Sequence, residues 1–162
     1  MDNYFNFKIS DIGDLLTQCR KLGFTNFEAA CNLIKKLPFG RNSDRSNYNL
    51  VLKEQKGTCS TKYAFLKQLA IENGFDAITL CIGIYKMRAL NTKGIPSLLE
   101  NYQLNYILGA DTYLKYKDAI FDFTSENASS DNFYGSVMYE ETIEPKQIGN
   151  HKVNLHHQFL KS

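Results

Sequence analysis

The residue best placed for nucleophilic chemistry is a cysteine at the expected start of a helix. Cys59 follows Gly57-Thr58 and precedes a helical apolar pattern. The unpaired N–H groups and the dipole at a helix start favour an anion, which lowers a thiol pKa and increases the thiolate population. Lys62 is expected to add to this positive field. Cys59 is therefore a candidate nucleophile for attack on a carbonyl carbon, and the alternative is that it only fills a small space beneath the helix.

Two downstream segments carry carboxylates that the fold could bring to this thiol. Residues 106–116 and 119–124 are aromatic and β-branched, which is typical of strands. The two-residue connection Lys117-Asp118 suits an antiparallel hairpin. Asp111 lies on the first predicted strand and Asp122 on the second.

In this order, the three segments resemble the transglutaminase-like proteins of the papain-type cysteine protease superfamily. Gly57–Ser60 matches the Gly-x-Cys-Ser element that opens the central helix of that family, and Phe121–Thr124 matches its apolar-Asp-apolar-Thr element. The resemblance covers residues 53–125. It implies acyl-transfer chemistry by a thiolate, an imidazole that moves its proton, and a carboxylate that orients the imidazole. Cys59 and Asp122 match the first and third roles.

The sequence departs from the family pattern at the middle position, where Asp111 stands in place of the histidine. An aspartate cannot replace the imidazole, and its negative charge opposes formation of a neighbouring thiolate. The only histidines are His151, His156 and His157, in a polar C-terminal segment where we expect exposed or locally bonded side chains. The adjacent His156 and His157 point in different directions and cannot form an i, i+4 metal pair, so we expect no metal and no cofactor.

Two tyrosines lie close in sequence to these positions and are candidate substrate-binding residues. Tyr63 is one helical turn after Cys59, and Tyr113 is on the same predicted strand as Asp111. Tyrosine suits a groove that holds a peptide, because its ring buries area while its hydroxyl finds a polar partner. The alternative for both is packing in the core or at its rim.

Hydrophobic periodicity predicts one α+β domain over residues 1–162, with N-terminal helices and a central cysteine-bearing helix packed on an antiparallel sheet. Besides the hairpin, we expect helices at 10–22, 25–37 and 58–73, a strand at 77–87, a short helix within 91–102, a strand at 135–143 and a short helix at 157–160. Residues 39–49 are expected to form a loop.

Composition narrows the classes of partner and location. The net charge of +2 gives no strong field that would favour nucleic acid or an anionic membrane, and no apolar run approaches bilayer length. The four cysteines lack C-x-x-C spacing and are expected to be free thiols in a reducing cytoplasm, with Cys59 the most accessible.

Two functional hypotheses follow from these residues. The first is a divergent, catalytically inactive transglutaminase-like domain that keeps its cleft to bind a peptide or protein. The alternative is an active thiol hydrolase or acyltransferase with Cys59 as nucleophile and Asp122 as the orienting group, in which a C-terminal histidine or a water replaces the base. An imidazole within hydrogen-bonding reach of Cys59 would favour the enzyme.

Overall fold

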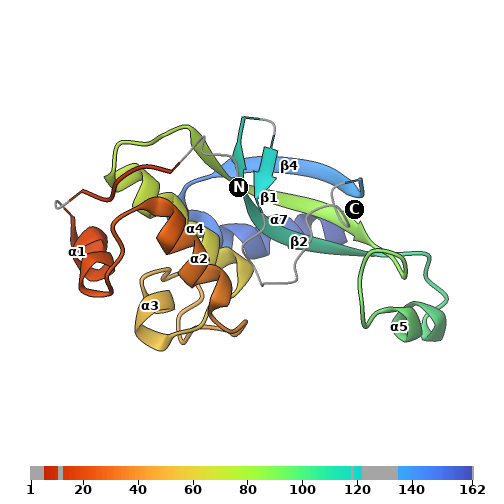
Figure 1. The fold of residues 1–162 in the computed structure, drawn as a ribbon. Coiled ribbons are helices and arrows are strands. Elements are labelled where there is room, and N and C mark those ends of the chain that lie inside the picture. The colour runs from red at the N-terminus through yellow and green to blue at the C-terminus, as the bar shows by residue number, and fades with distance from the viewer. Residues whose placement is uncertain (1–5, 11–12, 118, 122–134, 162) are drawn as a thin grey trace.

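The structure is a computed structural model that describes residues 6–10, 13–117, 119–121 and 135–161. Within these residues the protein is α+β, with helices packed on a four-stranded antiparallel sheet (Figure 1). The helices are α1 (Asp14–Lys21), α2 (Phe27–Lys36), α3 (Leu50–Glu54), α4 (Cys59–Glu72), α5 (Pro96–Asn101) and α7 (Asn150–Leu160), with a 3-10 turn η2 (Pro145–Ile148). The strands are β1 (Ile78–Met87), β2 (Ile107–Tyr116), β3 (Ala119–Phe121) and β4 (Val137–Ile143).

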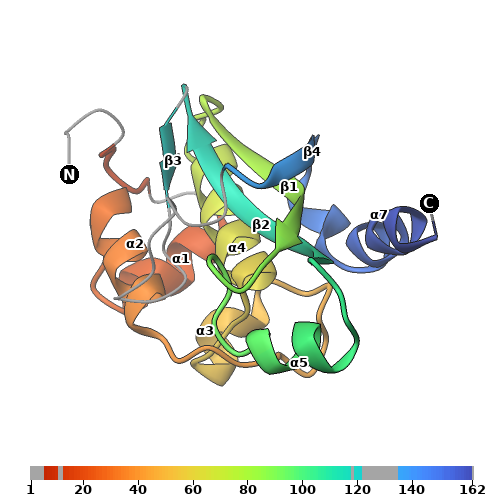
Figure 2. The ribbon, with the colours of Figure 1, turned by 90° about the vertical axis from the view of Figure 1, so that its right-hand side faces the viewer.

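The strand order of the sheet is β3-β2-β1-β4, as Figure 2 shows. β1 and β2 pair along their whole length, from Ile78 opposite Tyr116 to Met87 opposite Ile107. β3 pairs only with the end of β2, at Leu114–Tyr116. The centre of β2, which carries Asp111, is therefore held in register mainly by β1.

Helix α4 is the centre of the core and contacts α1, α2, α3, β1 and β2. Nearly every side of this helix is buried. Its buried residues include two lysines, a residue type that most helices of soluble proteins expose. The ammonium of Lys62 donates a hydrogen bond of 2.6 Å to the carbonyl of Leu37, and that of Lys67 donates one of 2.6 Å to the carbonyl of Ile78. These bonds give each buried ammonium a hydrogen-bond acceptor and help to fix the position of α4 against its neighbours.

The predicted helix at 58–73, the strand at 77–87 and the two N-terminal helices are confirmed, each within a few residues. The predicted hairpin is present as β2 and β3, as far as Phe121. The predictions for 91–102 and 135–143 are confirmed as α5 and β4. Figure 1 shows α1, α2 and α3 gathered at one end of the molecule and α5 projecting beyond the other end of the sheet.

The C-terminal segment differs from its prediction, because a full helix replaces the short one expected at 157–160. α7 runs from Asn150 to Leu160, and Leu155 is its one fully buried residue. A helix that buries so little has a weak apolar pattern, so its sequence resembles a polar tail. α7 contacts β2, β1 and η2 and so brings its own side chains to the sheet.

Candidate functional site

The start of α4 is fixed by a reciprocal cap. The Thr58 hydroxyl accepts from the backbone N–H of Thr61, and the backbone N–H of Thr58 donates to the Thr61 hydroxyl at 3.0 Å. The Thr61 hydroxyl also donates to the amide oxygen of Asn42 at 2.8 Å. This arrangement places Cys59 in the first turn, with α4 held against the loop that precedes α3.

The thiol of Cys59 lies beside Asp111, so these two predicted site residues come together. Burial raises the pKa of the thiol most, and the charge of Asp111 and its hydrogen bond with the thiol raise it further. The charge of Lys152 and the backbone N–H of Thr112 act in the opposite direction. The result is a Cys59 pKa of about 11 against an ordinary value of 9.0, although the side chain still reaches the protein surface in part. The thiol is therefore protonated at neutral pH.

A lysine from the C-terminal helix places a cation close to this thiol. The ammonium of Lys152 lies 3.9 Å from Cys59 Sγ and donates a hydrogen bond of 2.8 Å to Ser60 Oγ. A second hydrogen bond, of 3.1 Å, joins the Ser60 and Thr112 hydroxyls. These contacts connect α7, α4 and β2 in one polar cluster at the start of the central helix.

The polar cluster opens into a cleft of about 610 Å³. The cleft lies between the loop before α3, the start of α4, the centre of β2 and one side of α7. Its lining residues are Phe39, Arg41, Asn42, Ser43, Arg45, Thr58, Cys59, Ser60, Ala110, Ile148, Lys152, Val153, His156 and His157.

The three histidines bond elsewhere or have no bond to the thiol within the described residues. His151 pairs with Glu141 at 2.7 Å, and His156 bonds through Nε2 to the carbonyl of Leu108 at 2.9 Å. His156 and His157 line the cleft, but within the described residues no histidine is hydrogen-bonded to Cys59. His151 and His156 are therefore each bonded to a residue of the sheet rather than to their own segment.

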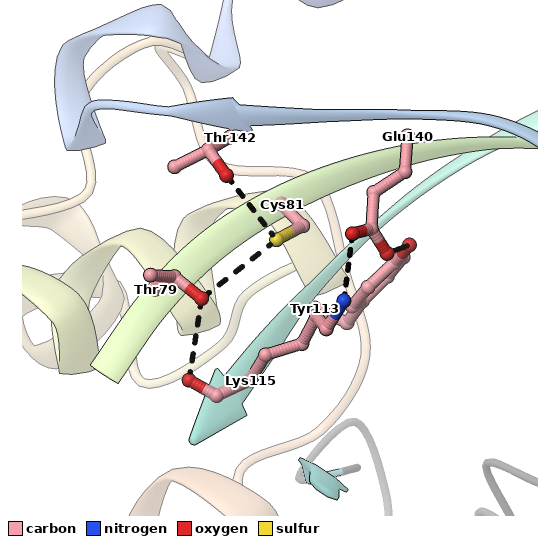
Figure 3. A network of polar contacts seen from close by, with 6 residues as sticks. All are labelled: Thr79, Cys81, Tyr113, Lys115, Glu140 and Thr142. Carbon is pink, nitrogen blue, oxygen red and sulfur yellow. Dashed lines mark hydrogen bonds and ion pairs between the residues drawn. The ribbon is translucent and has the colours of Figure 1, made fainter. Parts of the chain in front are cut away.

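The two candidate tyrosines lie away from the cleft lining. Tyr63 is 1% exposed in the core. Tyr113 is buried against Gly83, and its hydroxyl donates to Glu140 at 2.6 Å in a network that also holds Lys115 and Cys81 (Figure 3). In the structure both side chains are thus held by packing, which was the alternative for each.

The remaining sequence predictions have different outcomes. Asp122 lies outside the described residues. Lys62 is fully buried and donates its hydrogen bond to the carbonyl of Leu37. The cation that lowers the pKa of the Cys59 thiol is Lys152 instead. Cys19, Cys31 and Cys81 are buried free thiols, whereas Cys59 is half-buried, as predicted.

Sequence reasoning missed Lys152, Ser60 and the two arginines of the cleft. Arg41 and Arg45 lie in a polar loop and Lys152 in a segment without strong periodicity, so nothing in the sequence connects them with Cys59. Ser60 could have been identified from the sequence, because it directly follows Cys59 and must lie in the same first turn of the helix.

The described residues contain no group of His, Cys, Asp and Glu side chains that could hold a metal ion. In the same part of the chain, every helix is too short or too polar to cross a membrane. Comparison of the chain with protein-family models, with curated proteins and with solved structures found no match.

Proposed function

We propose that the protein is a divergent transglutaminase-like domain of the papain type whose cleft binds a peptide without cleaving it. The observation that carries the proposal is the pairing of Cys59 with Asp111, a carboxylate where the family pattern has an imidazole. The order of elements also supports it, because a cysteine-led central helix packs on an antiparallel sheet.

The chemistry of the pair argues against thiol catalysis. A nucleophilic cysteine acts as the thiolate, and a pKa of about 11 leaves about one thiolate in ten thousand molecules at pH 7. Acyl transfer also requires a group that takes the thiol proton and returns it to the leaving amine. Burial and the charge of Asp111 keep the proton on sulfur instead, so a bound amide would remain intact.

The shape and lining of the cleft suit a short peptide segment. A volume of about 610 Å³ lies within the range of about 300–1,000 Å³ typical of ligand sites. Ala110, Ile148 and Val153 offer apolar surface, and the exposed ring of Phe39 stands at the rim. Apolar surface beside placed polar groups is what a peptide with mixed side chains requires.

Selection from a random peptide library displayed on phage would test this function. We expect enriched peptides to be recovered intact, as mass spectrometry after prolonged incubation would show. Val153→Trp should abolish enrichment by filling the cleft, whereas Asn154→Trp, at the exposed neighbouring position outside the lining, should not. Recovery of cleaved peptides, or no enrichment by either the native chain or the control, would contradict the proposal.

One observation favours the alternative function of a thiol hydrolase or acyltransferase. The amine of Lys152 lies 3.9 Å from Cys59 Sγ, which is the arrangement that a lysine base would need. In that case a neutral Lys152 would take the thiol proton, and Lys152→Met would abolish turnover of an activated ester. Because Lys152 already donates to Ser60 and faces the Asp111–Cys59 pair, we favour the binding function.

A further inference from the structure

We propose that the cleft selects an acidic peptide, one that presents Asp or Glu carboxylates beside an apolar side chain. This inference rests on the proposed function and specifies the chemistry of its ligand. The charged side chains that line the cleft are basic, whereas the basic and acidic side chains of the whole chain are nearly balanced.

Positive charge is concentrated at the cleft. Three of its lining side chains, Arg41, Arg45 and Lys152, are basic, and the described residues of the lining include no Asp or Glu. His156 and His157 also line the cleft. The chain as a whole has a net charge of only +2, so the cleft is much more basic than the average surface.

Three carboxylates close in sequence to lining residues accept hydrogen bonds from inside the protein. Glu54 accepts hydrogen bonds from Asn42 and Ser43, and Asp44 accepts from the hydroxyl and the backbone N–H of Ser46. Asp111 lies beside the thiol of Cys59 and bonds to the backbone N–H of Thr112. Within the described residues no ion pair joins any of these carboxylates to Arg41 or Arg45, so both guanidinium groups can pair with a ligand's carboxylate.

The positions of the cations predict how such a peptide would lie. Arg41 and Arg45 are exposed on the loop before α3, whereas Lys152 is half-buried beside Ser60 on the α7 side. Carboxylates at two points of one peptide would meet both sides of the cleft, and a planar guanidinium can hold a carboxylate by two bonds. Val153, Ile148 and the Phe39 ring would contact an apolar side chain between them.

A peptide fits this lining better than a single-stranded nucleic acid does. Binding of unpaired bases depends on aromatic rings that stack on successive bases. Among the described residues that line the cleft, Phe39 is the one Phe, Tyr or Trp side chain, and the other apolar members are aliphatic. The lining therefore suits side-chain carboxylates beside an apolar side chain better than phosphates between stacked bases.

Fluorescence anisotropy of three labelled nonapeptides would test the inference. The peptides share one apolar scaffold and carry Glu, Gln or Lys at the same alternating positions. We expect the Glu peptide to bind at least about tenfold more tightly than the Gln peptide at low salt, with the difference shrinking as salt is raised. The double variant Arg41→Glu/Arg45→Glu should weaken binding of the Glu peptide at least about fivefold, whereas Arg88→Glu, at an exposed arginine outside the lining, should not.

The outcomes separate this inference from the proposed function. If the Gln or Lys peptide binds as tightly as the Glu peptide, and Val153→Trp abolishes that binding, the acidic preference is wrong while peptide binding stands. If none of the three binds and selection from the random library is also empty, both proposals fail. Tighter binding of a single-stranded oligonucleotide than of the Glu peptide would overturn the inference in favour of a nucleic-acid ligand.

Discussion

The ammonium of Lys152 and the hydroxyl of Ser60, 92 residues apart in the chain, are joined by a hydrogen bond of 2.8 Å. This bond connects the C-terminal helix to the first turn of the central helix and closes one side of the cleft. It also places a cation near Cys59, where Asp111 has the opposite effect on the thiol. The properties of the site therefore depend on two charges of opposite sign.

Asp111→Asn should make the Cys59 thiol more reactive. Removing the carboxylate charge removes one cause of the raised pKa, so the thiolate population at pH 8 should increase about three- to tenfold. The measurement is the rate of iodoacetamide alkylation at Cys59, followed by peptide mapping. Glu140→Gln is the matched control, because Glu140 belongs to the network of Tyr113 and Lys115 and should leave the rate at Cys59 unchanged. A slower rate in Asp111→Asn would show that this carboxylate supports a working nucleophile.

Lys152→Met should destabilise the contact between α7 and α4. The methionine keeps much of the apolar stem but leaves Ser60 without its charged donor, which should cost about 0.5–1.5 kcal/mol in the free energy of unfolding. Urea denaturation monitored by circular dichroism would measure this cost. Lys161→Met, at the exposed end of the same helix, should have no measurable effect. Equal losses in the two variants would mean that the bond to Ser60 does not hold α7 in place.

Gly57→Ala should be unusually costly for a glycine-to-alanine change before a helix. A methyl group at this position would lie 2.9 Å from Lys62 Cγ and 3.3 Å from Val51 Cγ2, and both side chains are fully buried. We expect a loss of about 1–3 kcal/mol from overpacking. At Gly40, a methyl group would meet Cδ of Lys56 at 3.2 Å, near the far end of a flexible chain, so Gly40→Ala should be close to neutral. Chemical denaturation of the two variants side by side tests the difference, and an equal effect would contradict it.

Stability should fall on the alkaline side of neutrality. The pKa of Cys59 is raised from 9.0 to about 11 and that of Cys19 to about 12, both chiefly by burial. A thiol whose pKa is higher in the folded state binds its proton more tightly there, so it contributes stability that is complete below about pH 9. This contribution is lost as the pH rises from about 9 towards 11 and 12. Urea midpoints at pH 8, 9.5 and 10.5 should therefore decrease, and less steeply in Cys59→Ser; a midpoint that increases with pH would contradict the assigned burial.

The central part of this fold was predictable because its signals are local. The Gly57-Thr58 break, the cap and the apolar run that follows determine where α4 begins, and β-branched residues mark β1 and β2. The pairing of Cys59 with Asp111 was predicted from the family resemblance and the order of the elements.

The rest of the cleft could not be predicted, since its residues meet only through tertiary packing. Lys152 reaches Ser60 because α7 folds back on β2, and a helix with one fully buried residue leaves little periodicity in the sequence. Lys62 illustrates the opposite error. Its sequence position suggested a cation near the thiol, but the packing of α4 on all sides directs its ammonium to the carbonyl of Leu37.

The pH dependence of Cys59 alkylation in the native protein tests the central claim most directly, because that claim is a protonated thiol in a binding cleft. Native and urea-unfolded chains would be alkylated in parallel between pH 7 and 10, with the rate at Cys59 read by mass spectrometry. The account predicts that the native rate keeps rising through pH 9, towards a midpoint of about 11, and is about a hundredfold lower than the unfolded rate at neutral pH. A native rate that is already constant above pH 7, and faster than in the unfolded chain, would identify Cys59 as an activated nucleophile and contradict the account.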